Sequence, residues 1–171
     1  MVAHLTAPTS TSLPQAVFAA IRARGDFDRM ADTWARRRAQ KLSPNDLVTK
    51  LRASAGSARR MPGSGPMAPL VDILVHAQDI ARPLGLAVPP PADAGAVVLT
   101  HLAETPFFGT PARIEGLRLI ATEAQASIGG GAAEVHGPIQ DLLLVATGRP
   151  AGLNGVTGAG VSLLRNRLTG D

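Results

Sequence analysis

The chain has 171 residues, a formal net charge of +4 and 45% hydrophobic residues, which excludes a disordered tail and leaves room for one or two small folded domains. It has no cysteine, so disulfides, cysteine-ligated metal sites and thiol nucleophiles of its own are excluded. Its arginine runs are short and lack interleaved aromatic residues, its apolar runs are too short to span a membrane, and its start does not resemble a signal peptide. We therefore expect a cytoplasmic protein that binds neither nucleic acid nor membrane.

The first two thirds of the chain have the periodicity of helices. A short helical fragment at residues 2–5 is expected to precede five helices over 13–24, 26–42, 43–55, 69–84 and 92–103. The run from 61 to 66 consists of turn-forming residues and predicts a loop. This part is interpreted as a helical domain over residues 1–104.

The pattern changes after an irregular segment expected over residues 105–111. Apolar and polar residues alternate over 117–122, which predicts a strand, and a second strand is expected at 133–136 after three consecutive glycines. We interpret the two as a β-hairpin. Two more helices are expected, one starting at Gly137–Pro138 and capped by Gly148, the other over 161–168. The fold class expected is therefore α+β, with a small α+β domain over residues 105–171.

One pair of side chains on the expected helix 69–84 has the spacing of metal ligands. Asp72 and His76 are four residues apart, so they lie on one helical face about 6 Å apart, close enough to hold one ion. A carboxylate on so apolar a helix is costly to bury without a cation or strong donors. His4 could supply a third ligand from another helix and leave a coordination position open, as a catalytic site requires. The alternative is an ordinary surface hydrogen bond between Asp72 and His76.

Two arginines and one further carboxylate are candidates for roles beside this site. Asp79 and Arg82 are interpreted either as an intrahelical ion pair, or as a carboxylate that orients a metal ligand and an arginine that binds an anionic ligand such as a cofactor. Arg149 is either an ordinary exposed arginine or a residue that reaches from the second domain to the site. His101 and His136 are expected to be exposed.

A family resemblance rests on residues 69–85, which contain the spacing Asp72-x-x-x-His76-x-x-Asp79-x-x-Arg82. This run resembles the actinobacterial maleylpyruvate isomerase family of mycothiol-dependent enzymes. The segment around His4 and the runs at 116–122, 137–144 and 148–150 are similar to the same family, so the resemblance covers nearly the whole chain. It implies a DinB-like N-terminal helical bundle and a small C-terminal α/β module.

The resemblance also implies a function. His4, Asp72 and His76 would be the metal triad, with zinc the usual ion, and Arg149 would take the place of the family's active-site arginine. The metal would bind the sulfur of mycothiol as a thiolate, which adds to a small electrophile in an isomerase or S-transferase reaction. The alternatives are a non-catalytic metal-binding or interaction protein that retains the fold, such as an N-terminally truncated family member, and a helical protein whose apparent ligands lie together by accident.

The chain departs from the family pattern in two ways. The acidic ligand of the family's characterised isomerase is a glutamate, whereas this chain has Asp72, which is one methylene shorter. The family also has a full helix before the one that bears the first histidine, whereas His4 follows almost directly after Met1. We therefore expect a bundle that lacks its first helix, which leaves an apolar face exposed. Either the true start lies upstream of Met1, or the protein pairs with a partner, for example as a homodimer, or it has decayed.

Overall fold

The computed structural model describes residues 1–7, 14, 18, 26–57 and 59–170. Nearly all of the helix expected over residues 13–24 lies outside these described residues. The chain forms two compact units, Met1–Asp72 and Ile73–Asp171, and their boundary falls within one helix. The division at residue 104 stays a prediction, since a unit defined by packing need not coincide with a domain defined by descent. None of the described helices combines the length and the apolar character needed to cross a bilayer.

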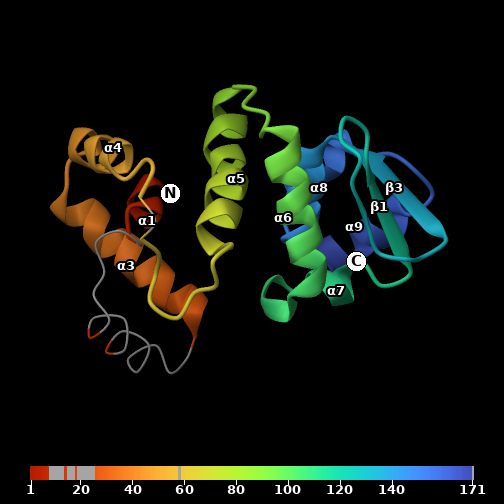
Figure 1. Cartoon of the computed structure of the whole chain (residues 1–171), viewed down its shortest axis with the longest axis horizontal. Helices are drawn as coiled ribbons and strands as arrows, with labels where there is room; N and C mark the ends of the chain where they lie inside the picture. The colour runs from red at the N-terminus through yellow and green to blue at the C-terminus, as the bar shows by residue number, and fades with distance from the viewer. Residues whose placement is uncertain (8–13, 15–17, 19–25, 58, 171) are drawn as a thin grey trace. The chain divides into compact units, whose positions relative to one another are not determined.

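The described part of the first unit consists of helices, two of which begin at polar caps. It contains α1 (Val2–Leu5), α3 (Phe27–Lys41), α4 (Pro44–Ala53) and the start of α5 (Ala68–Ala81). At the start of α3 the Asp26 carboxylate accepts a hydrogen bond from the Arg29 amide, and at the start of α4 Ser43 and Asp46 cap each other reciprocally. The helix α1 packs against α3 and α4 (Figure 1). The expected helices at 2–5, 26–42 and 43–55 are thus confirmed.

The second unit combines helices with a small sheet. After the rest of α5 come η1 (Arg82–Leu84), α6 (Ala92–Glu104), η2 (Pro106–Phe108), α7 (Thr110–Arg113), β1 (Leu117–Ala121), β2 (Ser127–Ile128), β3 (Ala133–Gly137), α8 (Ile139–Ala146), η3 (Pro150–Gly155) and α9 (Val161–Thr169). The α+β class is therefore confirmed. The irregular segment expected over 105–111 is wrong in part, because short helical turns occupy it.

The strand pairing differs from the expected hairpin. The sheet has the order β2-β1-β3, with β2 antiparallel to β1 and β3 parallel to β1. The prediction that 117–122 and 133–136 form a hairpin is wrong, because β3 runs parallel to β1 and the antiparallel partner of β1 is β2. Two of the glycines between β2 and β3 pass directly against the start of β1: a Cβ at Gly131 would overlap the backbone of Gly116, and a Cβ at Gly129 would overlap the carbonyl of Leu117. They permit a close crossing to the other edge rather than a hairpin turn.

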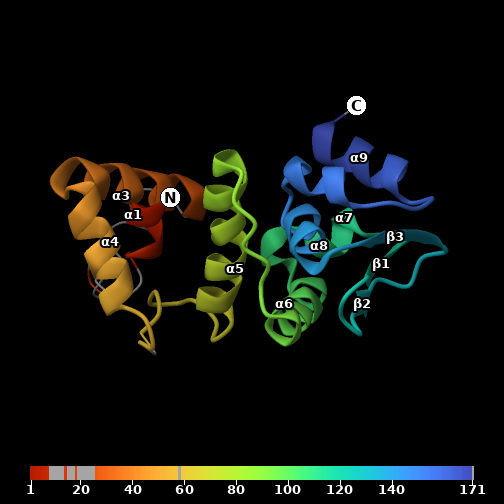
Figure 2. The same ribbon diagram turned by 90° about the horizontal axis from the view of Figure 1, so that it is seen from above.

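The core of the second unit lies between the sheet and the helices α6 and α8. These two helices lie side by side in both views (Figures 1 and 2). Gly95 allows their close approach, since a Cβ at this position would lie 2.7 Å from Cγ1 of Ile139. The fully buried side chains come from α6, the sheet, α8 and α9, and include Val98, Leu99, Leu102, Leu117, Leu119, Val135, Leu142, Leu143 and Leu164. This packing gives α8 and its C-terminal end a fixed position within the unit.

Candidate metal centre

The helix α5 carries a polar row along an otherwise apolar surface. Val71, Leu74 and Val75 are buried, whereas Asp72 and His76 are half-buried. Because these two are four residues apart, their side chains leave the helix in nearly the same direction, one turn from each other. The helix thus offers a carboxylate oxygen and an imidazole nitrogen on one face, as the spacing predicted.

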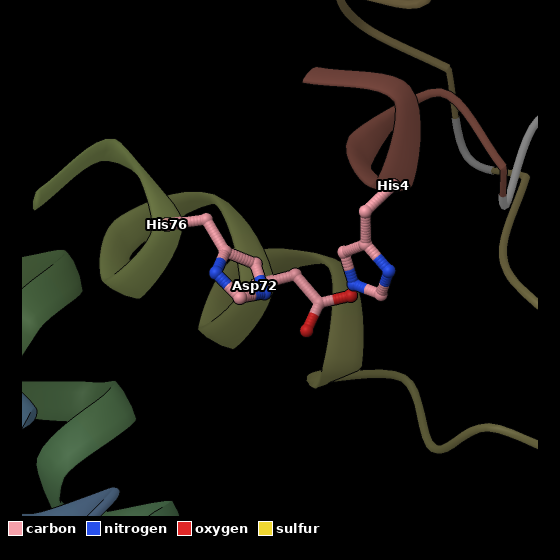
Figure 3. Close-up of side chains that lie close together, drawn as sticks. All are labelled: His4, Asp72 and His76. Atoms are coloured by element: carbon pink, nitrogen blue, oxygen red, sulfur yellow. The ribbon is translucent and has the colours of Figure 1, made fainter. Parts of the chain in front are cut away.

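His4 reaches the same place from α1. Its neighbours Ala3 and Thr6 are buried against the rest of the first unit, and the Thr6 hydroxyl donates a hydrogen bond of 3.0 Å to the carbonyl of Ala3. The His4 side chain is half-buried and points toward the carboxylate of Asp72 (Figure 3). The buried residues therefore anchor the short helix, and His4 lies on its less buried side.

His4, Asp72 and His76 together form a cluster that could hold a metal ion, which we call the metal cluster. One ligand atom from each residue lies within 4.8 Å of the other two. Tetrahedral ligands about 2.0–2.1 Å from a zinc ion lie roughly 3.3 Å apart, so shifts of about an ångström would bring the three to one ion. Among the residues that the structure describes, this is the only such group of three His or acidic side chains. Its donor set fits a divalent ion with an open coordination position.

A second carboxylate, that of Asp79, contacts the His76 ring at Nδ1. Nδ1 of His76 lies 2.8 Å from Oδ2 of Asp79, and these side chains are only 15% and 21% exposed. Nε of Arg149 donates to both carboxylate oxygens of Asp79, at 3.0 and 3.1 Å. Partial burial raises the pKa of Asp79, but the hydrogen bonds and charges of Arg149 and His76 outweigh it and place this pKa below its usual value. Asp79 is therefore a carboxylate at neutral pH.

Arg149 is brought to Asp79 by the way α8 ends. Gly148 has a φ of 86° and its amide donates to the carbonyl of Val145, while the Arg149 amide donates to the carbonyl of Leu144 at 2.8 Å. This pair of bonds is a Schellman motif, which fixes the direction of the chain just after the helix. The capping role predicted for Gly148 is confirmed, and it explains how Arg149 lies beside a residue that is 70 positions earlier in the sequence.

Arg82 has other partners than the one expected. Its Nη2 donates to Oδ1 of Asp141 at 2.7 Å, Nη1 to the carbonyl of Ala151 at 3.2 Å, and Nε to Oε1 of Gln78 at 3.3 Å. The expected intrahelical pair between Asp79 and Arg82 is wrong, since each is paired with a residue of the segment 141–151 instead. The role of Arg82 in binding an anionic ligand stays a prediction.

Sequence reasoning missed Asp141 and Gln78, which are both buried. The signal for Asp141 was a lone acidic residue within an apolar helical run, because such a carboxylate needs a cation nearby. The two remaining histidines lie outside the metal cluster. His101 is half-buried rather than exposed, and the side chain of His136 is 40% exposed with Nε2 3.0 Å from Oε2 of Glu134.

Comparison with known proteins adds no relative. No family model, no curated protein and no solved structure matches the chain. The metal cluster and the residues around it are therefore the features that indicate a function.

Proposed function

We propose that this chain is a divalent-metal protein of the DinB-like, maleylpyruvate isomerase type, which uses a low-molecular-weight thiol to attack a small electrophile as an S-transferase or isomerase. His4, Asp72 and His76 would hold the ion, with zinc the first expectation and mycothiol the expected thiol. The observation that carries the metal part is the convergence of three half-buried donors from two helices within 4.8 Å.

The donor set supports a site that works on a bound ligand. Three protein ligands leave a coordination position open, whereas structural sites are usually closed by four. A divalent ion there would supply a Lewis acid that lowers the pKa of a thiol. The chain has no cysteine, so the thiol would come from a separate cofactor. Two imidazoles and one carboxylate also suit nickel and iron.

The catalytic role proposed for Arg149 is to bind an anionic group of the substrate. Its Nε is engaged by Asp79 and its Nη1 makes a long contact of 3.3 Å to the carbonyl of Thr147. The side chain is 30% exposed, so part of it remains accessible to a ligand. An arginine held in this way is a pre-oriented donor for a carboxylate.

One observation favours a second candidate function, a non-catalytic metal-binding protein. Both arginines proposed to receive ligands, Arg82 and Arg149, are already paired with carboxylates of the chain itself, Asp141 and Asp79. A protein that only binds a metal would need these two arginines only for the stability of its fold.

Elemental analysis of the purified full chain tests the metal part. We expect close to one equivalent of zinc, nickel or iron per chain, lost in the His4→Ala and His76→Ala variants. The matched control is His101→Ala, which removes a half-buried helical histidine outside the cluster. Metal content that is unchanged in the first two variants, or equally lost in the control, would refute the site.

Turnover separates the two candidate functions. The metal-loaded chain is mixed with mycothiol and an aryl chloride whose thioether product absorbs light. A carbon–sulfur bond forms, chloride leaves with the electrons of the carbon–chlorine bond, and the thiol proton passes to solvent. Turnover that needs both metal and thiol supports the transferase, whereas full metal content without turnover of this or any other electrophile supports the metal-binding protein.

A further inference from the structure

Asp79 and Arg149 form a chain of contacts that ends on a residue of the metal cluster. Nε of Arg149 donates hydrogen bonds to both carboxylate oxygens of Asp79, and Oδ2 of Asp79 is hydrogen-bonded to Nδ1 of His76. All three side chains are at most 30% exposed. His76 and Asp79 lie on α5 and Arg149 lies in the turn after α8, so the contacts join two segments of the second unit that are distant in the sequence.

The contact with Asp79 determines which nitrogen of His76 can bind a metal. Asp79 is a carboxylate and can only accept, so a 2.8 Å contact requires Nδ1 to carry the proton. A neutral imidazole with a proton on Nδ1 has its lone pair on Nε2. Figure 3 shows the other ring nitrogen of His76 turned toward Asp72, into the cluster. The same arrangement, a carboxylate behind a histidine, sets the tautomer and raises the basicity of metal-binding histidines in general.

Arg149 acts one step further from the cluster. A lone Asp79 side chain could rotate away from the ring, since its χ2 torsion has a broad preference. Nε of Arg149 donates to both oxygens and so restricts this rotation, with Oδ2 facing His76. The backbone of Arg149 is in turn fixed by the capping motif at the end of α8.

The geometry points to a positioning role for Asp79 and Arg149: together they hold His76 in the tautomer and orientation that present Nε2 to the metal. This inference rests on the proposed metal site and assigns to Arg149 a duty separate from binding substrate. The nearby pair of Arg82 and Asp141 provides the contrast, because it joins the same two parts of the unit, whereas the hydrogen bonds of Arg82 go to Gln78, Ala151 and Asp141 and none goes to the cluster.

The first test needs no metal. In the metal-free full chain, nitrogen-15 NMR of the His76 ring near neutral pH should show a protonated Nδ1. In Asp79→Ala the proton should no longer prefer Nδ1, and in a fraction of the molecules it should lie on Nε2 instead. An unprotonated Nδ1 in the wild-type chain would overturn the inference, whether or not the protein binds metal.

The second test measures zinc affinity by competition with a chelator. We expect Asp79→Ala to bind Zn²⁺ about 10–100-fold more weakly, the usual effect of losing such a carboxylate. Arg149→Ala should weaken Zn²⁺ binding less than Asp79→Ala does. Arg149→Lys should bind Zn²⁺ more tightly than Arg149→Ala, because the lysine restores one donor to Asp79. The control is Asp141→Asn, which removes the other arginine–carboxylate pair with little change in shape and should bind Zn²⁺ within about twofold of wild type.

The outcomes are distinguishable. Equal weakening by Asp141→Asn and Asp79→Ala would show that any ion pair of the unit matters only for stability, and would overturn the positioning role. Unchanged affinity in Asp79→Ala would overturn it too. A wild-type chain that binds no metal would instead refute the proposed function, and the NMR measurement would still decide whether Asp79 holds the ring.

Discussion

Removing the guanidinium of Arg82 tests whether this residue supports the fold or binds a ligand. Its partner Asp141 is a side chain that is only 6% exposed, and Arg82→Ala leaves this carboxylate without its cation. Breaking a buried pair in this way costs about 3–5 kcal/mol. The Arg82 side chain is 29% exposed, so water can enter the space it leaves and offset part of the penalty. We therefore expect a loss of about 2–3 kcal/mol in the free energy of unfolding.

Urea unfolding of the full chain measures this loss. A second change, Asp141→Asn in the Arg82→Ala background, should recover part of the stability because the isolated buried charge is gone. A loss within about 0.5 kcal/mol of zero, the range of ordinary surface substitutions, would refute the structural role. If such a stable variant also failed to bind the thiol cofactor, the prediction that Arg82 binds it would be favoured instead.

The remaining predictions concern the caps, the helix packing and the metal. Gly148→Ala should cost about 1–2 kcal/mol in urea unfolding, because its φ of 86° strains any residue with a Cβ; an unchanged value would mean that α8 ends differently. Gly95→Ala should cost about 1 kcal/mol net, since overpacking against Ile139 of about 1–3 kcal/mol exceeds a helix-propensity gain of about 1 kcal/mol. A more stable variant would contradict the close contact. Hydrogen bonds from the Ser43 side chain and backbone lower the pKa of Asp46, so this cap stabilises fully above the usual carboxylate range and is lost as pH falls through the lowered pKa. An NMR titration should show the Asp46 pKa rising in Ser43→Ala, and an unchanged pKa would exclude this cause. Finally, Zn²⁺ at 100 times its Kd should stabilise the protein by about 2.7 kcal/mol, with no gain once a cluster histidine is replaced.

Local signals in the sequence were enough for most elements in the described residues. Asp26 marks the start of α3, Ser43–Pro44 marks the start of α4, and Gly148 marks the end of α8. These are contacts between residues at most a few positions apart, so they depend on the local sequence alone. Strand pairing does not depend on the local sequence alone, because β1 has two edges. The alternation of apolar and polar residues does not determine which segment pairs with which edge. The hairpin prediction was wrong for this reason.

The metal cluster could be predicted in part. Asp72 and His76 follow from helical spacing, since four residues bring two side chains to one face. No spacing rule joins them to His4, which lies 68 positions before Asp72; it was proposed as a third ligand from another apolar helical fragment and again through the family resemblance, and the structure places it beside the other two.

The sequence by itself therefore determined the α+β class, the helix ends and one face of α5 that carries ligand-type side chains. The tertiary structure alone decided that Asp79 pairs with Arg149 and Arg82 with Asp141, partners 70 and 59 positions apart. The physical reason is the range of the interactions. Caps and helical faces are set by bonds within a turn, whereas the partner of a half-buried charge depends on which distant segment the packed core brings within about 3 Å.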